Sequence, residues 1–110
     1  MIIDFHAHLW ARADAEEAMA EVAARHGVDR ICISAIESHV PDVAEVERLN
    51  ARTLRAIRQW PDLYLGFVYV NPKHGKVALR MIDEAAEQGM VGIKLWVSCY
   101  ATDPDVCPIA

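Results

Sequence analysis

The chain has 110 residues, 54% of them hydrophobic, which is enough for one ordinary core, so we expect a single domain over residues 1–110. Its net charge of −5, with lysine and arginine dispersed, argues against a nucleic-acid partner, which needs a clustered basic stripe. The longest apolar runs, such as LYLGFVYV, are too short to span a membrane, and the first residues do not resemble a signal peptide. We therefore expect neither a nucleic-acid nor a membrane partner.

The three cysteines are odd in number and show no CxxC spacing; they are Cys32, Cys99 and Cys107. This usage favours free thiols in a reducing, cytoplasmic setting over a disulfide framework or a zinc ribbon.

The first half of the chain alternates between strand and helix patterns. IIDFH (2–6) predicts a strand, and residues 13–27 have the apolar spacing of a helix. Asp14 stands at the position of its N-cap and Gly27 at its carboxyl end. VDRICISAI (28–36), rich in β-branched residues, predicts a second strand.

The second half repeats this alternation. A helix is predicted to begin at Asp42, where DVAE has the capping pattern. It should end before Pro61, because proline disfavours helical geometry in its predecessor. LYLGFVYV (63–70) is nearly apolar throughout, as expected of a parallel strand that is buried on both faces. KVALRMIDEAAEQ (76–88) then predicts a third helix, and VGIKLWV (91–97) predicts a fourth strand.

The resulting order, βαβαβαβ, predicts an α/β fold with a parallel sheet and right-handed crossovers. Two architectures share this order, an open doubly wound sheet and a closed (βα)8 barrel. The first turn, HAHLWARAD, contains no glycine, which argues against a Rossmann phosphate site.

The opening strand carries the strongest functional signal. Period-two alternation would place Asp4, His6 and His8 on one face of this strand. His6 and His8 end the strand, on the side where such folds carry their chemistry, and so predict a site for zinc or another divalent metal. Asp4 either accepts a hydrogen bond behind the pair or simply fills the interior.

The other histidines carry weaker signals. His39 and His74 follow the second and third strands on the same side of the fold, where they are more often solvated loop residues than ligands. His26 enters the second strand on the opposite side, as a surface residue at a helix end.

The fourth strand adds a candidate lysine. If Val91, Ile93, Leu95 and Val97 face the helices, then Lys94 and Trp96 face the interior near the functional end. A buried lysine is costly unless it is paired or used, so Lys94 either has a functional role or extends to solvent between strands.

These segments resemble the amidohydrolase superfamily. DFHAH resembles its DxHxH strand, and four later segments resemble its amidohydrolase-2 branch: GVDRICISAI, WPDLYLGFVYVNP, GMVGIKLW and DPDVCPIA. That branch comprises metal-dependent hydrolases, lactonases and nonoxidative decarboxylases built on a (βα)8 barrel. The resemblance implies the N-terminal half of a TIM-type barrel, incomplete within this chain, with a divalent metal, most simply zinc, and a small-molecule substrate.

The resemblance also assigns residues. His6 and His8 match the metal ligands of the first strand, and Lys94 matches the lysine of the GxKL strand, expected to contact substrate or metal. Trp96 is expected to contact substrate, and Trp10 lies in a loop that either lines the pocket or covers the core. The family takes further histidines from strands five and six and a general-base aspartate from strand eight. No residue here matches that aspartate, so the catalytic residue is left unassigned.

Three functional hypotheses follow from these observations. The first is a metal-dependent hydrolase, in which activated water attacks an amide, lactone or similar carbonyl, with nonoxidative decarboxylation as its alternative. The second is a non-catalytic half barrel that works by pairing its edges with another chain. The third, a TatD-like nuclease, is disfavoured because it would need a glutamate where Lys94 stands.

Four strands cannot close a barrel, so we expect exposed strand edges that pair with a partner. The chain is then part of a longer protein, an inactive remnant, or a half barrel that dimerises. In such a dimer, strand four of each copy would lie beside strand one of the other, with Lys94 next to the other copy's histidine pair.

Overall fold

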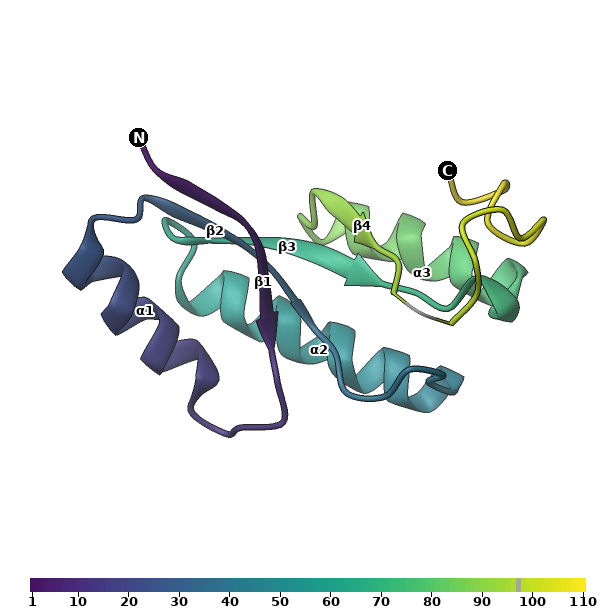
Figure 1. Ribbon diagram of the computed structural model, residues 1–110, viewed down its shortest axis with the longest axis horizontal. Helices are drawn as coiled ribbons and strands as arrows, with labels where there is room; N and C mark the ends of the chain where they lie inside the picture. The colour runs from purple at the N-terminus through teal and green to yellow at the C-terminus, as the bar shows by residue number, and fades with distance from the viewer. Residues whose placement is uncertain (97) are drawn as a thin grey trace.

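The computed structural model describes residues 1–96 and 98–110, in which four strands alternate with three α-helices and one short 3-10 helix (Figure 1). Their order is β1 (Ile3–Leu9), α1 (Ala15–His26), β2 (Arg30–Ala35), α2 (Val43–Gln59), β3 (Tyr64–Tyr69), η1 (Pro72–His74), α3 (Lys76–Glu87) and β4 (Gly92–Lys94). The strands are parallel and adjacent in the order β1-β2-β3-β4. The predicted βαβαβαβ order is confirmed. Within the described ranges, each helix is too short or too polar to cross a membrane.

All three α-helices cover the same face of the sheet. Ile31 and Ile33 of β2 belong to a buried cluster with residues of α1 and α2. Val68 of β3 packs in a second cluster with residues of α3. Paired residues of parallel strands share a face, and the register from β2 to β3 places Ile33 beside Gly66. Val68 follows Gly66 by two residues, so it points to the same face as Ile33. The opposite face, which we call the open face, is covered by none of these helices.

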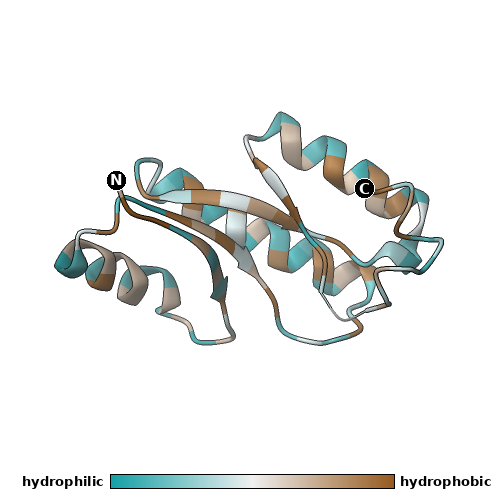
Figure 2. Ribbon diagram, turned by 45° about the horizontal axis from the view of Figure 1, so that its top comes forward, coloured by the Kyte–Doolittle hydropathy of each residue, from teal (hydrophilic) through white to brown (hydrophobic). Residues whose placement is uncertain are grey.

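Hydrophobic residues colour much of the strands, whereas the helices alternate between polar and apolar residues along their length (Figure 2). In α2 the buried positions recur with helical spacing; they are Val46, Leu49, Asn50, Thr53 and Ala56. The Asp42 carboxylate accepts a hydrogen bond of 2.8 Å from the backbone N–H of Glu45, which satisfies one unpaired donor at the start of the helix. The predicted cap is confirmed.

Helix α1 is capped differently from our expectation. Asp14 occupies the N-cap position, but its side chain makes no cap hydrogen bond and pairs with Arg12 instead. At the other end, Gly27 adopts a left-handed conformation with φ of 68°, which ends the helix as predicted.

Helix α2 also supplies hydrogen bonds to the ends of two strands. The Asn50 side chain donates to the carbonyl of Tyr69 and accepts from its N–H, both at 2.8 Å. The Thr53 hydroxyl accepts from the N–H of Ala35 at 3.0 Å. These bonds pair buried backbone groups where β2 and β3 end, which fixes the positions from which the following loops depart.

The bounds of the outer strands differ from the predicted ones. Strand β1 extends to Leu9 rather than residue 6, because Ala7, His8 and Leu9 continue the pairing with β2. Strand β4 covers only residues 92–94 of the predicted 91–97, since its ladder with β3 ends at Lys94. Leu95 and Trp96 lie beyond the strand, and Val97 lies outside the described residues.

The bridge between α2 and β3 yields a stability prediction. We expect Asn50→Ala to lower the free energy of unfolding by about 2–6 kcal/mol, because two buried backbone groups each lose a partner at a cost of ~1–3 kcal/mol. Urea denaturation measures the change. Glu47→Ala, at an exposed position of the same helix, is the control and should change stability by less than about 0.5 kcal/mol. Equal effects of the two substitutions would contradict the bridging role of Asn50.

Candidate metal centre

Strand β1 contains an irregularity that decides which of its side chains meet. Asp4 pairs with Ile31 and Ala7 pairs with Ile33, so a step of three residues in β1 matches a step of two in β2. This extra residue is a β-bulge, after which His8 pairs with Ser34 in the regular way. The bulge changes which face each side chain of the strand points to.

The expectation that Asp4 shares a face with the histidines is therefore wrong. Asp4 pairs with Ile31, which packs on the helix side, and it lines a shallow hollow there with Met19 and Val22 of α1. Its carboxylate instead accepts a hydrogen bond of 3.0 Å from the backbone N–H of His6. Asp4 supports the bulge and does not lie beneath the histidine pair.

The rings of His6 and His8 converge on the open face. Their Nε2 atoms lie 2.9 Å apart, and the ring centroids are 4.7 Å apart with an interplanar angle of 86°. The other nitrogen of His8, Nδ1, lies 3.1 Å from the hydroxyl of Ser34 on β2. Ser34 thus orients His8 through one ring nitrogen, so that the other points toward His6.

Lys94 reaches this pair from β4, the strand at the opposite edge of the sheet. Its Nζ lies 2.9 Å from His6 Nε2, although β1 and β4 are separated by two strands. This contact agrees with the prediction that Lys94 points to the interior of the fold. The residues on either side of Lys94 lie toward α3: Ile93 borders a hollow with residues of α3, and Leu95 packs against the buried cluster of that helix. Three nitrogen atoms therefore crowd together at the carboxyl end of the sheet.

Burial and charge both disfavour protonation at this place. Burial lowers the pKa of Lys94. The pKa of His8 is lowered first by burial and then by the positive charges of Lys94 and His6. The unprotonated imidazole is the form that binds metal ions, so the environment favours His8 as a ligand.

The donor set fits part of a metal site. Two nitrogens about 2.0–2.1 Å from one ion lie about 2.8–3.0 Å apart at an angle of 90° and about 3.3–3.4 Å apart at the tetrahedral angle. The observed 2.9 Å corresponds to an angle of about 90°, so the two rings would separate by a few tenths of an ångström around a tetrahedral ion. His6 Nε2 carries either one hydrogen or one lone pair, so it cannot hydrogen-bond fully with both His8 and Lys94. A cation that accepts both imidazole lone pairs would remove the conflict between the two histidines, and the Lys94 amine would then have to turn away from His6 Nε2.

The described residues do not complete the ligand set. In residues 1–96 and 98–110, no three side chains of His, Cys, Asp or Glu come together as a metal site. Cys32 borders the same hollow, but burial raises the pKa of its thiol, which disfavours the thiolate that binds metals. The two histidines therefore supply two of the three protein ligands of an ordinary catalytic zinc site.

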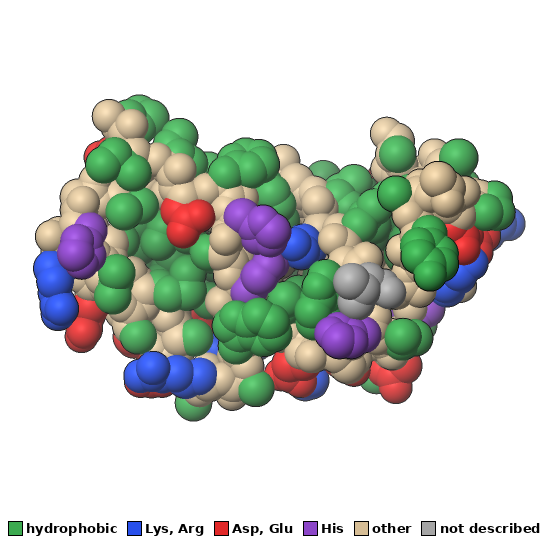
Figure 3. Space-filling view, in the orientation of Figure 1, with side chains coloured by type: hydrophobic (Ala, Val, Ile, Leu, Met, Phe, Trp, Pro, Cys, Tyr) green, Lys and Arg blue, Asp and Glu red, His purple; other side chains and the backbone are tan. Residues whose placement is uncertain are grey.

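The site occupies a hollow of about 250 Å³ on the open face. In the space-filling view, histidine side chains and a basic side chain meet near the middle of the face, with hydrophobic side chains around them (Figure 3). Phe5 and Phe67 form its apolar side, with ring centroids 5.4 Å apart. Gly92 allows this packing, because a Cβ there would lie only 2.7 Å from the Phe67 ring.

The tryptophans form an aromatic wall beside the histidines. Trp10 lies edge-to-face with His8 at 6.0 Å and with Trp96 at 6.2 Å. Trp96 in turn contacts His39, with centroids 4.6 Å apart, so His39 belongs to this wall. His74 lies in η1 with an Nδ1 atom that is buried and lacks a hydrogen-bond partner within the described parts of the chain.

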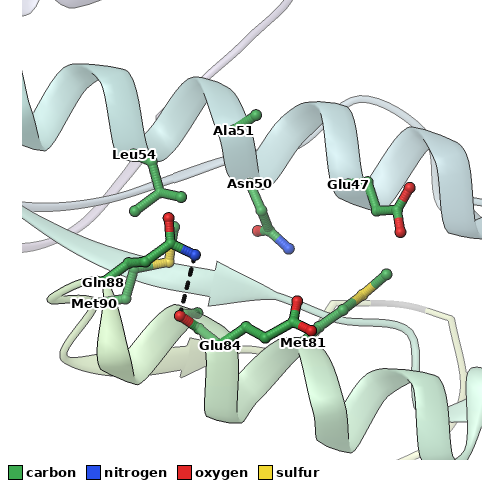
Figure 4. A pocket seen from close by; sticks show the side chains of 9 residues that line it. Glu47, Asn50, Ala51, Leu54, Met81, Glu84, Gln88 and Met90 are labelled. Atoms are coloured by element: carbon green, nitrogen blue, oxygen red, sulfur yellow. Dashed lines mark hydrogen bonds between the residues drawn. The ribbon is translucent and has the colours of Figure 1, made fainter.

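A second hollow lies between α2 and α3, on the helix side of the molecule (Figure 4). It measures about 140 Å³, and the polar side chains that line it come from Glu47, Asn50, Glu84 and Gln88. Asn50 is already committed to Tyr69, and Gln88 donates to the carbonyl of Glu84. It contains no histidine or cysteine, so it lacks the side chains that make the open face a candidate metal site.

Comparison with known proteins places the fold. No protein-family model and no curated protein matches this sequence. Among solved structures, an amidohydrolase II matches with a TM-score of 0.79 and 18% identity, over 96% of this chain and 44% of the other. The chain has the fold of the N-terminal half of a (βα)8 barrel.

Two further structures agree with this half barrel. A 2,6-dihydroxybenzoate decarboxylase from Rhizobium matches with a TM-score of 0.77 and 13% identity, over 97% of this chain and 44% of the other. A probable 2-pyrone-4,6-dicarboxylic acid hydrolase from Acinetobacter baumannii, solved with citric acid bound, matches with a TM-score of 0.64 and 20% identity, over 97% and 43%. The chain thus spans less than half the length of the structures that it matches.

Sequence reasoning identified the histidine pair but missed the residues that support it. Cys32 and Ser34 lie two residues apart on β2 and face the histidines. Their place beside the histidines can be inferred only when the register between β1 and β2 is known. Phe5 was missed because regular alternation would have turned it toward the helices, and the bulge brings it to the open face.

The contact between Lys94 and the histidines yields a prediction about protonation. In the metal-free chain, we expect Lys94→Met to raise the pKa of His8, because the lysine charge is one of its lowering causes. The pKa should stay below its ordinary value, because burial, the largest cause, remains. An NMR titration of the His8 ring measures this, with Lys76→Met at the exposed start of α3 as the control. An unchanged or lower pKa in Lys94→Met would contradict this electrostatic coupling.

Proposed function

We propose that this chain is the N-terminal half of a metal-dependent hydrolase of the amidohydrolase-2 type. The observation that carries the proposal is the convergence of His6 Nε2 and His8 Nε2, 2.9 Å apart, at the carboxyl end of a parallel half barrel. Catalytic sites of such barrels lie at this end of the strands. The solved structures that share the fold include a hydrolase and a decarboxylase, which supports an enzyme of this broad group.

In this proposal His6 and His8 hold a divalent cation, most simply zinc. When bound, such a cation polarises a carbonyl and makes a nucleophile of water at neutral pH. The chain's own residues prepare the site: Ser34 orients the ring of His8, and burial lowers the pKa of that ring, which favours its unprotonated form. The remaining ligands and the general base are supplied by a further part of a longer chain or by another subunit.

The open face suits a small anionic substrate with a planar apolar part. With a cation on His6 Nε2, the Lys94 ammonium group would lose its present contact and could pair instead with a carboxylate or a developing oxyanion in the same hollow. Trp10 and Trp96 offer aromatic surface on the same side of the histidines. Nonoxidative decarboxylation is the alternative within the same group, and the Rhizobium structure named above is such a decarboxylase.

A non-catalytic role as a half-barrel interaction module is the second candidate. It is supported by exposed apolar side chains near both outer strands, namely Ile2, Ile3 and Phe5 at β1 and Val91 and Ile93 at β4. A dimer would not be needed to bring Lys94 to a histidine pair, because Lys94 contacts His6 within one chain. A cytoplasmic location stays a prediction from the cysteine usage.

The metal hypothesis predicts ligand-dependent stability. Zinc at 100 times its dissociation constant should stabilise the chain by about 2.7 kcal/mol, and EDTA should reverse the effect. The stabilisation should disappear in His6→Ala and in His8→Ala, because each removes one of the two converging nitrogens. Thermal unfolding followed by circular dichroism, with and without zinc, measures it.

His26→Ala is the matched control, because His26 ends α1 on the opposite side of the fold and should leave the zinc effect intact. Equal stabilisation of the wild-type chain and the double variant His6→Ala, His8→Ala would contradict the metal site. A metal-independent oligomer that both variants retain would favour the interaction module.

A further inference from the structure

Arg52 of α2 makes an unusual set of contacts with the segment that follows β1. Its guanidinium donates to the backbone carbonyl of Trp10 at 2.5 Å and to that of Arg12 at 2.7 Å. It also forms a two-pronged ion pair with Glu16, at 2.6 and 2.8 Å. One side chain thus holds three points of a segment that lies 36–42 residues earlier in the sequence.

The ion pair is largely buried. The side chains of Arg52 and Glu16 are only 15% and 13% exposed. The hydrogen bond from Arg52 lowers the pKa of Glu16, which keeps the carboxylate charged. A charged pair in such surroundings is costly to break, because each partner would be left without its counter-charge.

A second arginine on the same helix provides a direct comparison. Arg48 forms a two-pronged pair with Glu37 at 3.0 and 2.6 Å, one helical turn earlier. The Arg48 side chain is 57% exposed, however, and Glu37 belongs to the loop after β2. Exposed pairs of this kind contribute little, so the two arginines have similar chemistry and different consequences.

The segment held by Arg52 carries one wall of the candidate metal centre. Trp10 comes two residues after His8, and its ring contacts both His8 and Trp96. Its side chain is about half exposed, so packing alone holds it weakly. The Arg52 bonds fix the backbone on both sides of Ala11 and thereby fix the direction from which the Trp10 ring departs.

We propose that Arg52 is a positioning residue, which holds the β1–α1 loop so that Trp10 stays against His8 and closes one side of the metal centre. The part of this inference that concerns metal rests on the proposed function, whereas the part that concerns Trp10 does not. Lysine cannot substitute, because its single ammonium group lacks the planar fork that reaches two carbonyls and a carboxylate together.

The fold should survive loss of Arg52. The start of α1 has a second anchor, because the Tyr64 hydroxyl donates to the backbone carbonyl of Glu16 at 2.5 Å. Leu9, just before the segment, is fully buried in the main cluster. Substitution at Arg52 should therefore release the loop between these two anchors and leave the sheet intact.

The test compares Arg52→Met and Arg52→Lys with Arg48→Met in the 110-residue chain. In the metal-free state, the NMR signal of the Trp10 indole N–H should shift in both Arg52 variants, because the Trp10 ring would leave the rings of His8 and Trp96 that lie beside it. It should be unchanged in Arg48→Met, and the Trp60 indole serves as an internal reference. Trp10→Phe assigns the signal. Identical Trp10 signals in all three variants and the wild type would overturn the inference.

Zinc binding, measured by isothermal titration calorimetry, gives the second readout. Loss of a supporting residue around a metal site weakens binding by about 10–100-fold, and we expect the lower end of that range for both Arg52 variants and no change for Arg48→Met. Released Trp10 with unchanged zinc affinity would overturn the role of Arg52 in the metal centre. If the wild type binds no zinc, the proposed function fails, and the Trp10 signal alone decides whether Arg52 holds the loop.

Discussion

The three α-helices bury their apolar sides on one face of the parallel sheet, and this one-sided packing decides where the polar side chains of the strands lie. Ile31, Ile33 and Val68 fill the helix side, so His6, His8 and Lys94 are left to the open face. Because parallel strands end at the same edge, residues 88 positions apart in sequence come within 2.9 Å of each other. Helix α2 then holds the ends of β2 and β3 through Thr53 and Asn50, and the loop after β1 through Arg52.

The site also depends on one break in the regular pattern. The bulge in β1 leaves Asp4 on the side of α1, while His6 and His8 lie on the open face. The Asp4 carboxylate accepts a hydrogen bond from the backbone N–H of His6 and so stabilises the bulge. Bulges near functional sites commonly redirect side chains in this way. The result is a local conflict at His6 Nε2, whose single hydrogen or lone pair faces both His8 and Lys94. Such departures from local consistency are expected at functional sites.

The order of elements, the cap at Asp42 and the direction of Lys94 could be predicted from the sequence, because each depends on residues close together in the chain. The strand bounds, the bulge and the Ser34 contact could not, because they depend on the register between neighbouring strands. The grip of Arg52 on Trp10 joins residues 42 positions apart and has no local signature. Fold class is thus readable from periodicity, whereas the geometry of the site emerges only from packing between elements.

If the two imidazoles of β1 bind one cation together, X-ray absorption at the zinc edge of the zinc-loaded 110-residue chain should show it. We expect imidazole scattering from two nitrogens at about 2.0–2.1 Å, with oxygen in the remaining positions and the imidazole signal lost when both histidines are replaced. Sulfur ligands at about 2.3 Å, which would come from the cysteines, or zinc without imidazole ligands would contradict it.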